Sequence, residues 1–260
     1  MRVALGIEYD GSYFCGFQFQ QGVPTVQERL ESALSSVADF PIKLHCAGRT
    51  DRGVHAKSQV IHFDTNVERP LTAWIKGTNA YLKKAICVQW AKFVSSEFHA
   101  RFSAISRQYR YIIANTNIKP AILDNYVTWH IYPLDETLMH EAAQSLVGKH
   151  DFSAFRSSEC DARTPMRHLQ EISVKRLNHF VIVEVRANAF LHHMVRIIVG
   201  NLLAVGDKRR PVSAVKEVLE SRQRKLGAET AKSNGLYLIA VHYPSHFDIP
   251  SCHNPCIILQ

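Results

Sequence analysis

The stretch CAGRTDRGVHA, residues 46–56, lies between two apolar runs, and the other elements of the chain can be placed around it. It follows the short run 42–46 and precedes QVIHF at 59–63, which has the composition of a β-strand. Gly48 and Gly53 bracket its centre, and glycine allows a positive φ or a close approach of the backbone to a ligand. The pattern predicts a loop between two neighbouring strands.

The charged residues of this loop suggest chemistry. One carboxylate, Asp51, lies between two guanidiniums, Arg49 and Arg52. A single acid on a glycine-flanked loop suits a nucleophile better than a metal site, because no second carboxylate lies nearby in the sequence. On local chemistry alone, an ordinary polar hairpin is the commoner explanation of such a loop. The loop is therefore a candidate active site that needs support from the rest of the chain.

Length and composition indicate an ordinary globular protein. The 260 residues allow one large domain or two smaller ones, and 46% hydrophobic with 21% charged residues allow an ample core. The first ten residues carry charges at Arg2, Glu8 and Asp10, so we expect no secretion signal. The uncharged apolar run 197–205 is too short to span a bilayer. We expect a cytoplasmic protein that does not enter a membrane.

The formal net charge of +8 permits a nucleic acid as partner but does not prove one. Residues 98–123 contain four cations and no acid, and further basic zones lie at 156–176 and 208–210. The first zone has the cations Arg101, Arg107, Arg110 and Lys119 and the rings Phe98, Phe102, Tyr109 and Tyr111. Cations interleaved with flat rings suit unpaired RNA. A solvated basic face is the alternative.

The cysteines give no sign of a disulfide framework or a metal site. Six cysteines are scattered along the chain without a CxxC pair, so we expect free thiols. Cys252, His253 and Cys256 near the end lack a fourth ligand nearby, so we expect no zinc there. We expect neither a metal nor a cofactor.

Apolar periodicity predicts the order β-α-β-β-α-β in each half of the chain, which is the ferredoxin-like order. Strands are predicted near 3–7, 42–46, 59–63, 86–93, 107–113, 168–176, 180–187 and 236–242. Helices are predicted from Thr25, from Pro70, and at 135–147, 190–205 and 212–221. We therefore predict an α+β fold of two ferredoxin-like halves, 1–97 and 98–244, joined through their sheets, with the active-site cleft between them and a tail at 245–260.

Two local signals sharpen the helix boundaries. Thr25 and Glu28 form a capping box, which predicts that a helix begins directly after Thr25. Gly148 is placed to end the helix that begins near 135. The hairpin formed by 168–176 and 180–187 should turn around Asn178.

The helix predicted at 190–205 is apolar on nearly every side, which is typical of a buried helix. Arg196 is the only formal charge between Arg186 and Asp207. A buried guanidinium is costly unless it is paired and hydrogen-bonded, so we expect a carboxylate partner, with Asp51 as the candidate. Alternatively, Arg196 reaches the surface or pairs with another acid.

The sequence GRTDxGVHA at 48–56 resembles the signature loop of the tRNA pseudouridine synthase A (TruA) family. The residue after the aspartate is usually alanine in that family and is Arg52 here. Further similar segments are GFQFQ at 16–20, FHARF at 98–102, RQYRY at 107–111, HHMVRIIVG at 192–200 and GLYL at 235–238. The resemblance covers nearly the whole chain.

The resemblance implies an enzyme that isomerises uridines 38, 39 and 40 in the tRNA anticodon stem-loop, acting as a homodimer without a cofactor. It implies that Asp51 is the nucleophile, that Arg196 pairs with it and that Tyr109 stacks on the substrate. Arg49 matches the signature arginine, which we assign to the target phosphate or to the place that the base vacates. Arg52 and Arg110 are further candidates for phosphate contacts.

Two other functions are considered. A non-catalytic RNA-binding protein could keep the same fold, but the presence of Asp51, Tyr109 and Arg196 argues against it. A metal-dependent hydrolase would need a carboxylate or histidine cluster at ligand spacing, which the sequence lacks.

Overall fold

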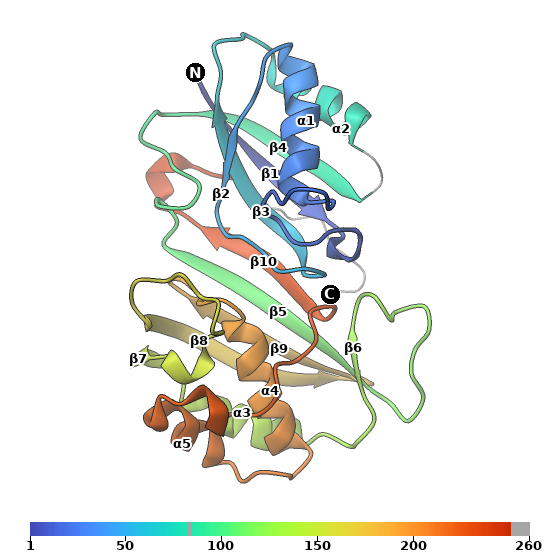
Figure 1. The fold of residues 1–260 in the computed structure, drawn as a ribbon, viewed down its shortest axis with the longest axis vertical. Coiled ribbons are helices and arrows are strands. Elements are labelled where there is room, and N and C mark those ends of the chain that lie inside the picture. The colour runs from blue at the N-terminus through green and yellow to red at the C-terminus, as the bar shows by residue number, and fades with distance from the viewer. Residues whose placement is uncertain (83–84, 251–260) are drawn as a thin grey trace. The chain divides into compact units, whose positions relative to one another are not determined.

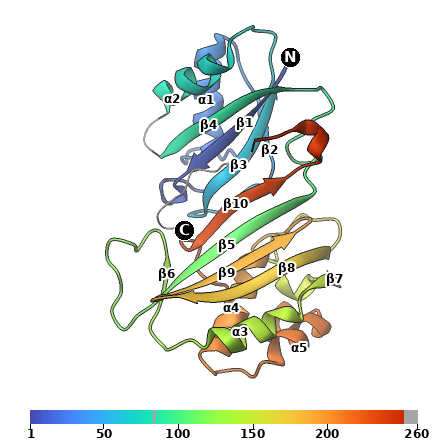
Figure 2. The same ribbon diagram turned by 180° about the vertical axis from the view of Figure 1, so that it is seen from behind.

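The computed structural model of the protein describes residues 1–82 and 85–250, and its packing divides the chain into two compact units (Figures 1 and 2). Of the described residues, the first unit comprises those within 1–105 and 238–250, and the second comprises 106–237. Both units combine β-strands with a few helices, which confirms the predicted α+β class. The predicted halves ended at 97 and 244, whereas the packing groups 98–105 and most of the last strand with the first unit.

The strands of the first unit pair antiparallel around β1 (Arg2–Tyr9). This strand lies between β3 (His55–Asp64) and β4 (Ile86–Val94). The short β2 (Leu44–Cys46) pairs with β3, and β10 (Leu236–His242) follows β3 in the strand order. The central strand is almost completely buried, as its apolar run predicts.

Helix α1 (Val26–Ala38) and the short α2 (Thr78–Tyr81) cover one face of these strands (Figures 1 and 2). The Thr25 side chain caps α1 by accepting a hydrogen bond from the backbone N–H of Glu28 at 3.3 Å. The predicted start of this helix is therefore confirmed.

The helix predicted from Pro70 is irregular in the structure. A π-helical segment, Ala73–Gly77, precedes α2 and brings the fully buried ring of Trp74 against Phe63, with ring centroids 5.1 Å apart. A Cβ atom at Gly77 would lie 3.1 Å from a methyl group of Val37 on α1. Glycine therefore allows the two helical segments to pack closely.

The second unit is built on an antiparallel ladder of four strands. Its order is β5 (Ser106–Asn115), β9 (Phe180–Ala187), β8 (Met166–Leu177) and β7 (Gly148–Asp151). A short parallel strand, β6 (Thr128–His130), adds to β5. The short strands β6 and β7 were not predicted from the sequence.

The hairpin of β8 and β9 turns around Asn178, whose φ is 52°. Asparagine tolerates this left-handed conformation better than most residues. The predicted hairpin is confirmed.

Three helices, α3 (Glu136–Gln144), α4 (Met194–Gly206) and α5 (Ala214–Ser221), pack against one another, and α3 also packs against β8 (Figure 1). Helix α4 is buried on nearly every side, as predicted. It begins four residues later than predicted, because His193 precedes it with a left-handed φ of 61°. Within the described chain, no helix has the length and apolar character needed to cross a bilayer.

The predicted end of α3 is wrong. The helix ends at Gln144, and Gly148 instead begins β7 with a φ of 118°. Val147, predicted to be buried on this helix, is 39% exposed. Val147 follows the end of α3, so it does not belong to the apolar face of the helix that the sequence periodicity predicted.

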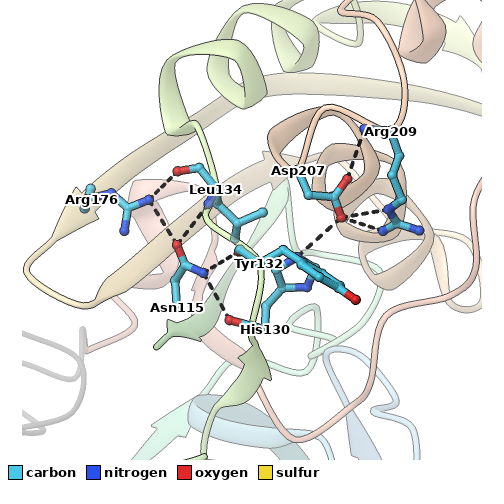
Figure 3. Close-up of polar contacts among 7 residues, drawn as sticks. All are labelled: Asn115, His130, Tyr132, Leu134, Arg176, Asp207 and Arg209. Atoms are coloured by element: carbon cyan, nitrogen blue, oxygen red, sulfur yellow. Dashed lines mark hydrogen bonds and ion pairs between the residues drawn. The ribbon is translucent and has the colours of Figure 1, made fainter. Parts of the chain in front are cut away.

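The side chain of Asn115, at the end of β5, fixes the segment that leads to α3 (Figure 3). Its oxygen accepts hydrogen bonds from the N–H of Leu134 at 3.0 Å and from the guanidinium of Arg176 at 3.3 Å. Its amide nitrogen donates to the carbonyls of His130 and Tyr132 at 3.0 and 2.7 Å. All hydrogen-bonding groups of this amide are therefore used within the second unit.

A second contact in the same region joins the end of α4 to β6 (Figure 3). Asp207 accepts hydrogen bonds from the backbone N–H and the Nε of Arg209 at 3.3 and 2.8 Å. The Nε2 of His130 lies 3.4 Å from the same carboxylate.

Replacing Asn115 should destabilise this region strongly. We expect Asn115→Ala to lower the free energy of unfolding by about 3 kcal/mol, because several hydrogen bonds are lost together. Urea unfolding followed by circular dichroism measures the change. The exposed Asn117, two residues further on, is the control. Equal midpoints for Asn115→Ala and Asn117→Ala would contradict the assigned role.

Candidate active site

The loop that carries Asp51 begins where the ladder between β2 and β3 ends. The last paired residues are Cys46 and Ile61, and the N–H of Ala47 donates to the carbonyl of Val60 at 2.8 Å. Beyond this point the loop 48–54 leaves the sheet, as the glycine-bracketed sequence predicts. Its backbone polar groups then need other partners.

Gln59 on β3 supplies the first of these partners. Its side chain is fully buried; its Nε2 donates to the carbonyl of Gly48 at 2.6 Å, and its Oε1 accepts from the N–H of Gly48 at 3.4 Å. The same amide lies 3.5 Å from the hydroxyl of Tyr9. The side-chain amide of Gln59 therefore takes the place of a paired strand for the first residue of the loop.

Thr50, directly before Asp51, is held on two sides. Its hydroxyl shares a buried hydrogen bond of 2.8 Å with the hydroxyl of Tyr9, and its carbonyl accepts from the N–H of Phe17 at 3.0 Å. Gly16 has a φ of 108°, and a Cβ there would lie 3.1 Å from the Thr50 carbonyl oxygen. Only glycine fits this conformation without strain, so the GFQFQ segment packs closely on the loop.

The loop closes with a turn. The N–H of Val54 donates to the carbonyl of Asp51 at 3.1 Å, and Gly53 takes the left-handed conformation with a φ of 77°. A Cβ at Gly11 would lie 2.0 Å from the Val54 carbonyl oxygen. The segment directly after β1 therefore approaches the turn so closely that no side chain fits at Gly11.

His55, the first residue of β3, joins the same contact. Its ring is buried, its Nδ1 accepts a hydrogen bond from the N–H of Gly11 at 3.1 Å, and the carboxylate of Asp10 lies 3.2 Å away. The backbone on both sides of Asp51 is thus fixed by groups from β1, β3 and the segment after β1. Such fixed positioning is what a catalytic side chain needs.

The charged side chains of the loop remain accessible. Asp51 is partly exposed, and Arg49 and Arg52 are exposed. Burial raises the pKa of the neighbouring Cys46 thiol to about 12, although the guanidiniums of Arg49 and Arg101 oppose this rise. The thiol therefore stays protonated near neutral pH, in its weakly nucleophilic form.

The structure places Tyr109 and Arg110 on opposite faces of β5, as the alternation predicts. The ring of Tyr109 is 8% exposed and meets Phe190 edge to face, with centroids 5.1 Å apart. The guanidinium of Arg110 binds the carboxylate of Glu184 across the strand pair, at 2.5 and 2.7 Å. The charge of Arg110 is thus already balanced within the second unit.

Arg196 lies in the first turn of α4 and is partly buried. Its Nε donates to the carbonyl of Ala231 at 2.9 Å, and its own carbonyl accepts from the N–H of Ala231 at 3.1 Å. A Cβ at Gly200 would lie 1.9 Å from the carbonyl oxygen of Glu229. The segment 229–231 therefore lies directly on α4 and orients the guanidinium.

Arg196 also influences a buried tyrosine. Burial raises the pKa of Tyr111, and the charge of Arg196 opposes this rise. The hydroxyl of Tyr111 bonds to Thr128 and donates to the carbonyl of Lys232, both at 2.6 Å. Tyr111 therefore remains a neutral donor that helps to fix the segment after 231.

The predicted site residues fall into two groups. Arg49, Asp51 and Arg52 share one loop of the first unit, and Tyr109, Arg110 and Arg196 belong to the second unit. Sequence reasoning gave no role to the residues that hold the loop, although Gly16 and His55 lie in segments that resemble the family. These residues are Tyr9, Gly11, Gly16, His55 and Gln59. Gln59 had no local signal, because its strand also carries Lys57, Ser58 and His62.

Among the described residues of the first unit, the rings of His45, His62 and His99 bring one nitrogen each within 4.8 Å of one another. The Nδ1 of His62 accepts from the N–H of Ala100, and the Nδ1 of His99 accepts from two backbone N–H groups. In a neutral ring the proton then lies on Nε2, which leaves that nitrogen without a lone pair for a metal. Metal binding would therefore break these backbone hydrogen bonds.

The comparisons with known proteins give one consistent answer. The family model of the tRNA pseudouridine synthases matches residues 6–103 and 142–244. The curated tRNA pseudouridine synthase A of Shewanella frigidimarina is 53% identical over 250 residues, which is 96% of each chain. The curated protein of the same description from Haemophilus ducreyi is 54% identical over the same shares. The chain belongs to the tRNA pseudouridine synthase family.

Membership of this family of isomerases confirms the resemblance found in the sequence. The two stretches matched by the tRNA pseudouridine synthase model contain Asp51 and Arg196, while Tyr109 lies between them. The part of the chain that the match covers therefore includes the loop whose geometry is described above.

Removing the amide of Gln59 should loosen the loop. In Gln59→Leu the polar groups of Gly48 lose their partner, so we expect faster hydrogen exchange at residues 48–54 and a loss of about 1–3 kcal/mol in stability. Exchange measured by mass spectrometry reports the loop directly. The exposed Gln170 provides the control, Gln170→Leu. Unchanged exchange in Gln59→Leu would show that the amide does not hold the loop.

Proposed function

We propose that this protein is a tRNA pseudouridine synthase that converts uridine to pseudouridine in the anticodon stem-loop, with positions 38, 39 and 40 as expected targets. The similarity to curated tRNA pseudouridine synthase A proteins over 96% of the chain carries this proposal. The fixed backbone around Asp51 supports it, because the reaction needs a positioned nucleophile.

The proposed reaction moves a bond without adding or removing atoms from the RNA. The N1–C1′ bond of uridine breaks, the freed base turns, and a C5–C1′ bond forms. The proton on C5 leaves, and N1 gains one. Asp51 acts as the nucleophile in this proposal, by attack on either the sugar or the base, and no redox cofactor, nucleotide or metal is demanded.

The other site residues serve the extruded uridine. Flipping a base out of its stem costs a few kcal/mol, which stacking and backbone contacts must offset. We assign stacking to Tyr109 and contact with the target phosphate, or with the vacated place, to Arg49. Arg196 is assigned to substrate binding. Arg52 is a further phosphate contact, whereas Arg110 is the weakest of these assignments because Glu184 already binds its guanidinium.

We propose that the enzyme acts as a homodimer, that it works in the cytoplasm and that its two halves are ferredoxin-like. The β1-α1-β2-β3-α2-β4 order of the first part of the chain supports the last of these.

The role of Asp51 is tested by a substitution that keeps its size. We expect Asp51→Asn to bind tRNA nearly as well as the wild type and to lower the rate of pseudouridine formation at least about a thousandfold, since the nucleophile is lost. Release of tritium from tRNA labelled at uridine C5 measures the rate. Asp39→Asn is the control, because Asp39 has a left-handed φ of 53° that asparagine also accepts.

The outcomes separate two functions. If Asp51→Asn retains turnover, Asp51 is not the nucleophile. If even the wild type releases no tritium while tRNA stays bound, the protein is an RNA-binding protein that lacks this activity.

The role of Tyr109 is tested by a pair of variants. Tyr109→Phe keeps the ring and should keep the affinity for tRNA, whereas Tyr109→Leu should weaken it about tenfold through loss of stacking. Filter binding with the full tRNA measures both. Equal affinities for the two variants and the wild type would remove Tyr109 from the binding surface.

A further inference from the structure

Four aromatic rings meet in the first unit beside the start of the Asp51 loop. His45 on β2 stacks on His62 of β3, with centroids 5.1 Å apart and planes 23° from parallel. His99 lies 5.1 Å from His45 and 4.6 Å from His62. Phe102 lies 4.3 Å from His99 with planes 34° apart. The rings therefore run from a buried strand residue to the surface.

Backbone hydrogen bonds hold this group in place. The N–H of Ala100 donates to His62 at 3.1 Å, and the N–H groups of Arg101 and Phe102 donate to His99 at 3.1 and 3.3 Å. The N–H of His99 donates to the Ser103 hydroxyl at 2.9 Å. Because the rings are already fixed, binding a ligand to them costs little additional side-chain entropy of the protein.

The outer end of the group faces solvent. Phe102 is 75% exposed although it contacts His99, and His45 is exposed as well. The guanidinium carbon of Arg101 lies 5.5 Å from the centroid of the Phe102 ring. A single exposed phenylalanine would need no explanation, but an exposed ring that packs against a second ring with a cation over it is suited to RNA binding.

Arg101 is the exposed arginine of residues 98–123, and its guanidinium lies over the ring of Phe102. Arg107 is buried and Arg110 is partly buried. The arginine of this stretch that is most open to solvent therefore lies beside the exposed ring.

His62 and His99 contribute flat, uncharged surfaces. Burial, reinforced by nearby cations and histidines, lowers the pKa of His62 to about 3, and burial also lowers the pKa of His99. Both rings are neutral near pH 7, and Arg101 adds a permanent positive charge beside them.

We propose that His45, His99, Phe102 and Arg101 form a platform on which an unpaired base of the RNA substrate stacks, beside the loop that carries Asp51. The inference rests on the proposed tRNA substrate and adds a binding site to it. Phe102 supplies the face for the base, and Arg101 supplies charge for its phosphate. An unpaired nucleotide fits because it offers both a π-face and an anion.

Phe102→Leu tests the platform. The variant keeps an apolar side chain and removes the ring, so we expect about tenfold weaker binding of a tRNA anticodon stem-loop, whose loop bases can stack. Binding of a blunt RNA duplex of the same length should not change, because its bases are not available. Fluorescence anisotropy at one fixed salt concentration measures both.

Matched variants complete the design. Phe40→Leu replaces a phenylalanine of the same unit that is 60% exposed, and it should bind both RNAs as the wild type does. Phe102→Tyr restores a flat ring and should restore the affinity for the stem-loop. Thermal unfolding of each variant shows whether the fold is kept.

The results decide between a platform and other roles. Wild-type affinity of Phe102→Leu for the stem-loop, or equal losses for stem-loop and duplex, would overturn base stacking. Stem-loop binding by the wild type that depends on added zinc or is abolished by a chelator would favour a metal site at the three histidines instead.

The same variant separates this inference from the proposed reaction. With saturating tRNA, Phe102→Leu should keep the wild-type rate of pseudouridine formation and show a raised KM, because it weakens binding and not the chemical step. A wild type without activity would overturn the proposed reaction, whereas the comparison of stem-loop and duplex affinities would still test the platform.

Discussion

The hydrogen bonds between the side chain of Gln59 and the backbone of Gly48 set the shape of the Asp51 loop. Where β2 leaves β3, the loop backbone loses its ladder partners beside the fully buried side chain of Gln59. A buried polar group without a partner costs more than the hydrogen bond itself contributes. Gln59 presents one donor and one acceptor in the plane of its amide, which matches the N–H and carbonyl of one residue.

This contact depends in turn on the register of β1 and β3. Ile7 lies opposite Gln59, and a register shift follows before Tyr9, which lies opposite Ala56. A slip by one residue would turn Gln59 to the other face of the sheet. The irregularity between Ile7 and Tyr9 is of the kind that re-aims a side chain, and Tyr9 reaches Thr50 directly after it. The pairing of β1 with β3 therefore determines the shape of the Asp51 loop, because it places both Gln59 and Tyr9 against the loop.

The sequence predicted the elements whose signals are local. The capping pair at Thr25, the alternation around Tyr109 and the apolar length of α4 each reflect interactions within one segment, and the structure follows them. The predicted end of α3 at Gly148 failed because a glycine with positive φ can also begin a strand. The short strands β6 and β7 have too few residues to show a period.

The candidate site was predictable only in part for the same reason. The motif located Asp51, but nothing local says that Gln59 lies against Gly48, because that contact joins two strands across a loop. Gly11 and Gly16 read as ordinary loop glycines in the sequence. Glycine is required at these two positions because a Cβ atom would lie too close to the carbonyl oxygen of Val54 or Thr50, which only the structure shows.

The distribution of charge shows how composition and structure differ as guides to RNA binding. A net charge of +8 suggests many contacts to phosphate, yet a large share of the cations bind groups of the protein itself. Arg2 binds Asp64, and Arg176 binds Glu136. Pairs of this kind hold strands and helices together and leave little charge for a ligand.

Three exposed arginines, Arg49, Arg52 and Arg101, lie on short backbone segments that are themselves fixed. Arg49 and Arg52 flank Asp51 on a loop held by Gln59 and Tyr9, and Arg101 lies on a turn held by histidine side chains. A cation on a fixed backbone can contact a phosphate without first ordering the chain, so more of the interaction free energy is available for extruding a base. The contacts that stabilise the fold and those that would bind RNA therefore meet in the same few residues of backbone.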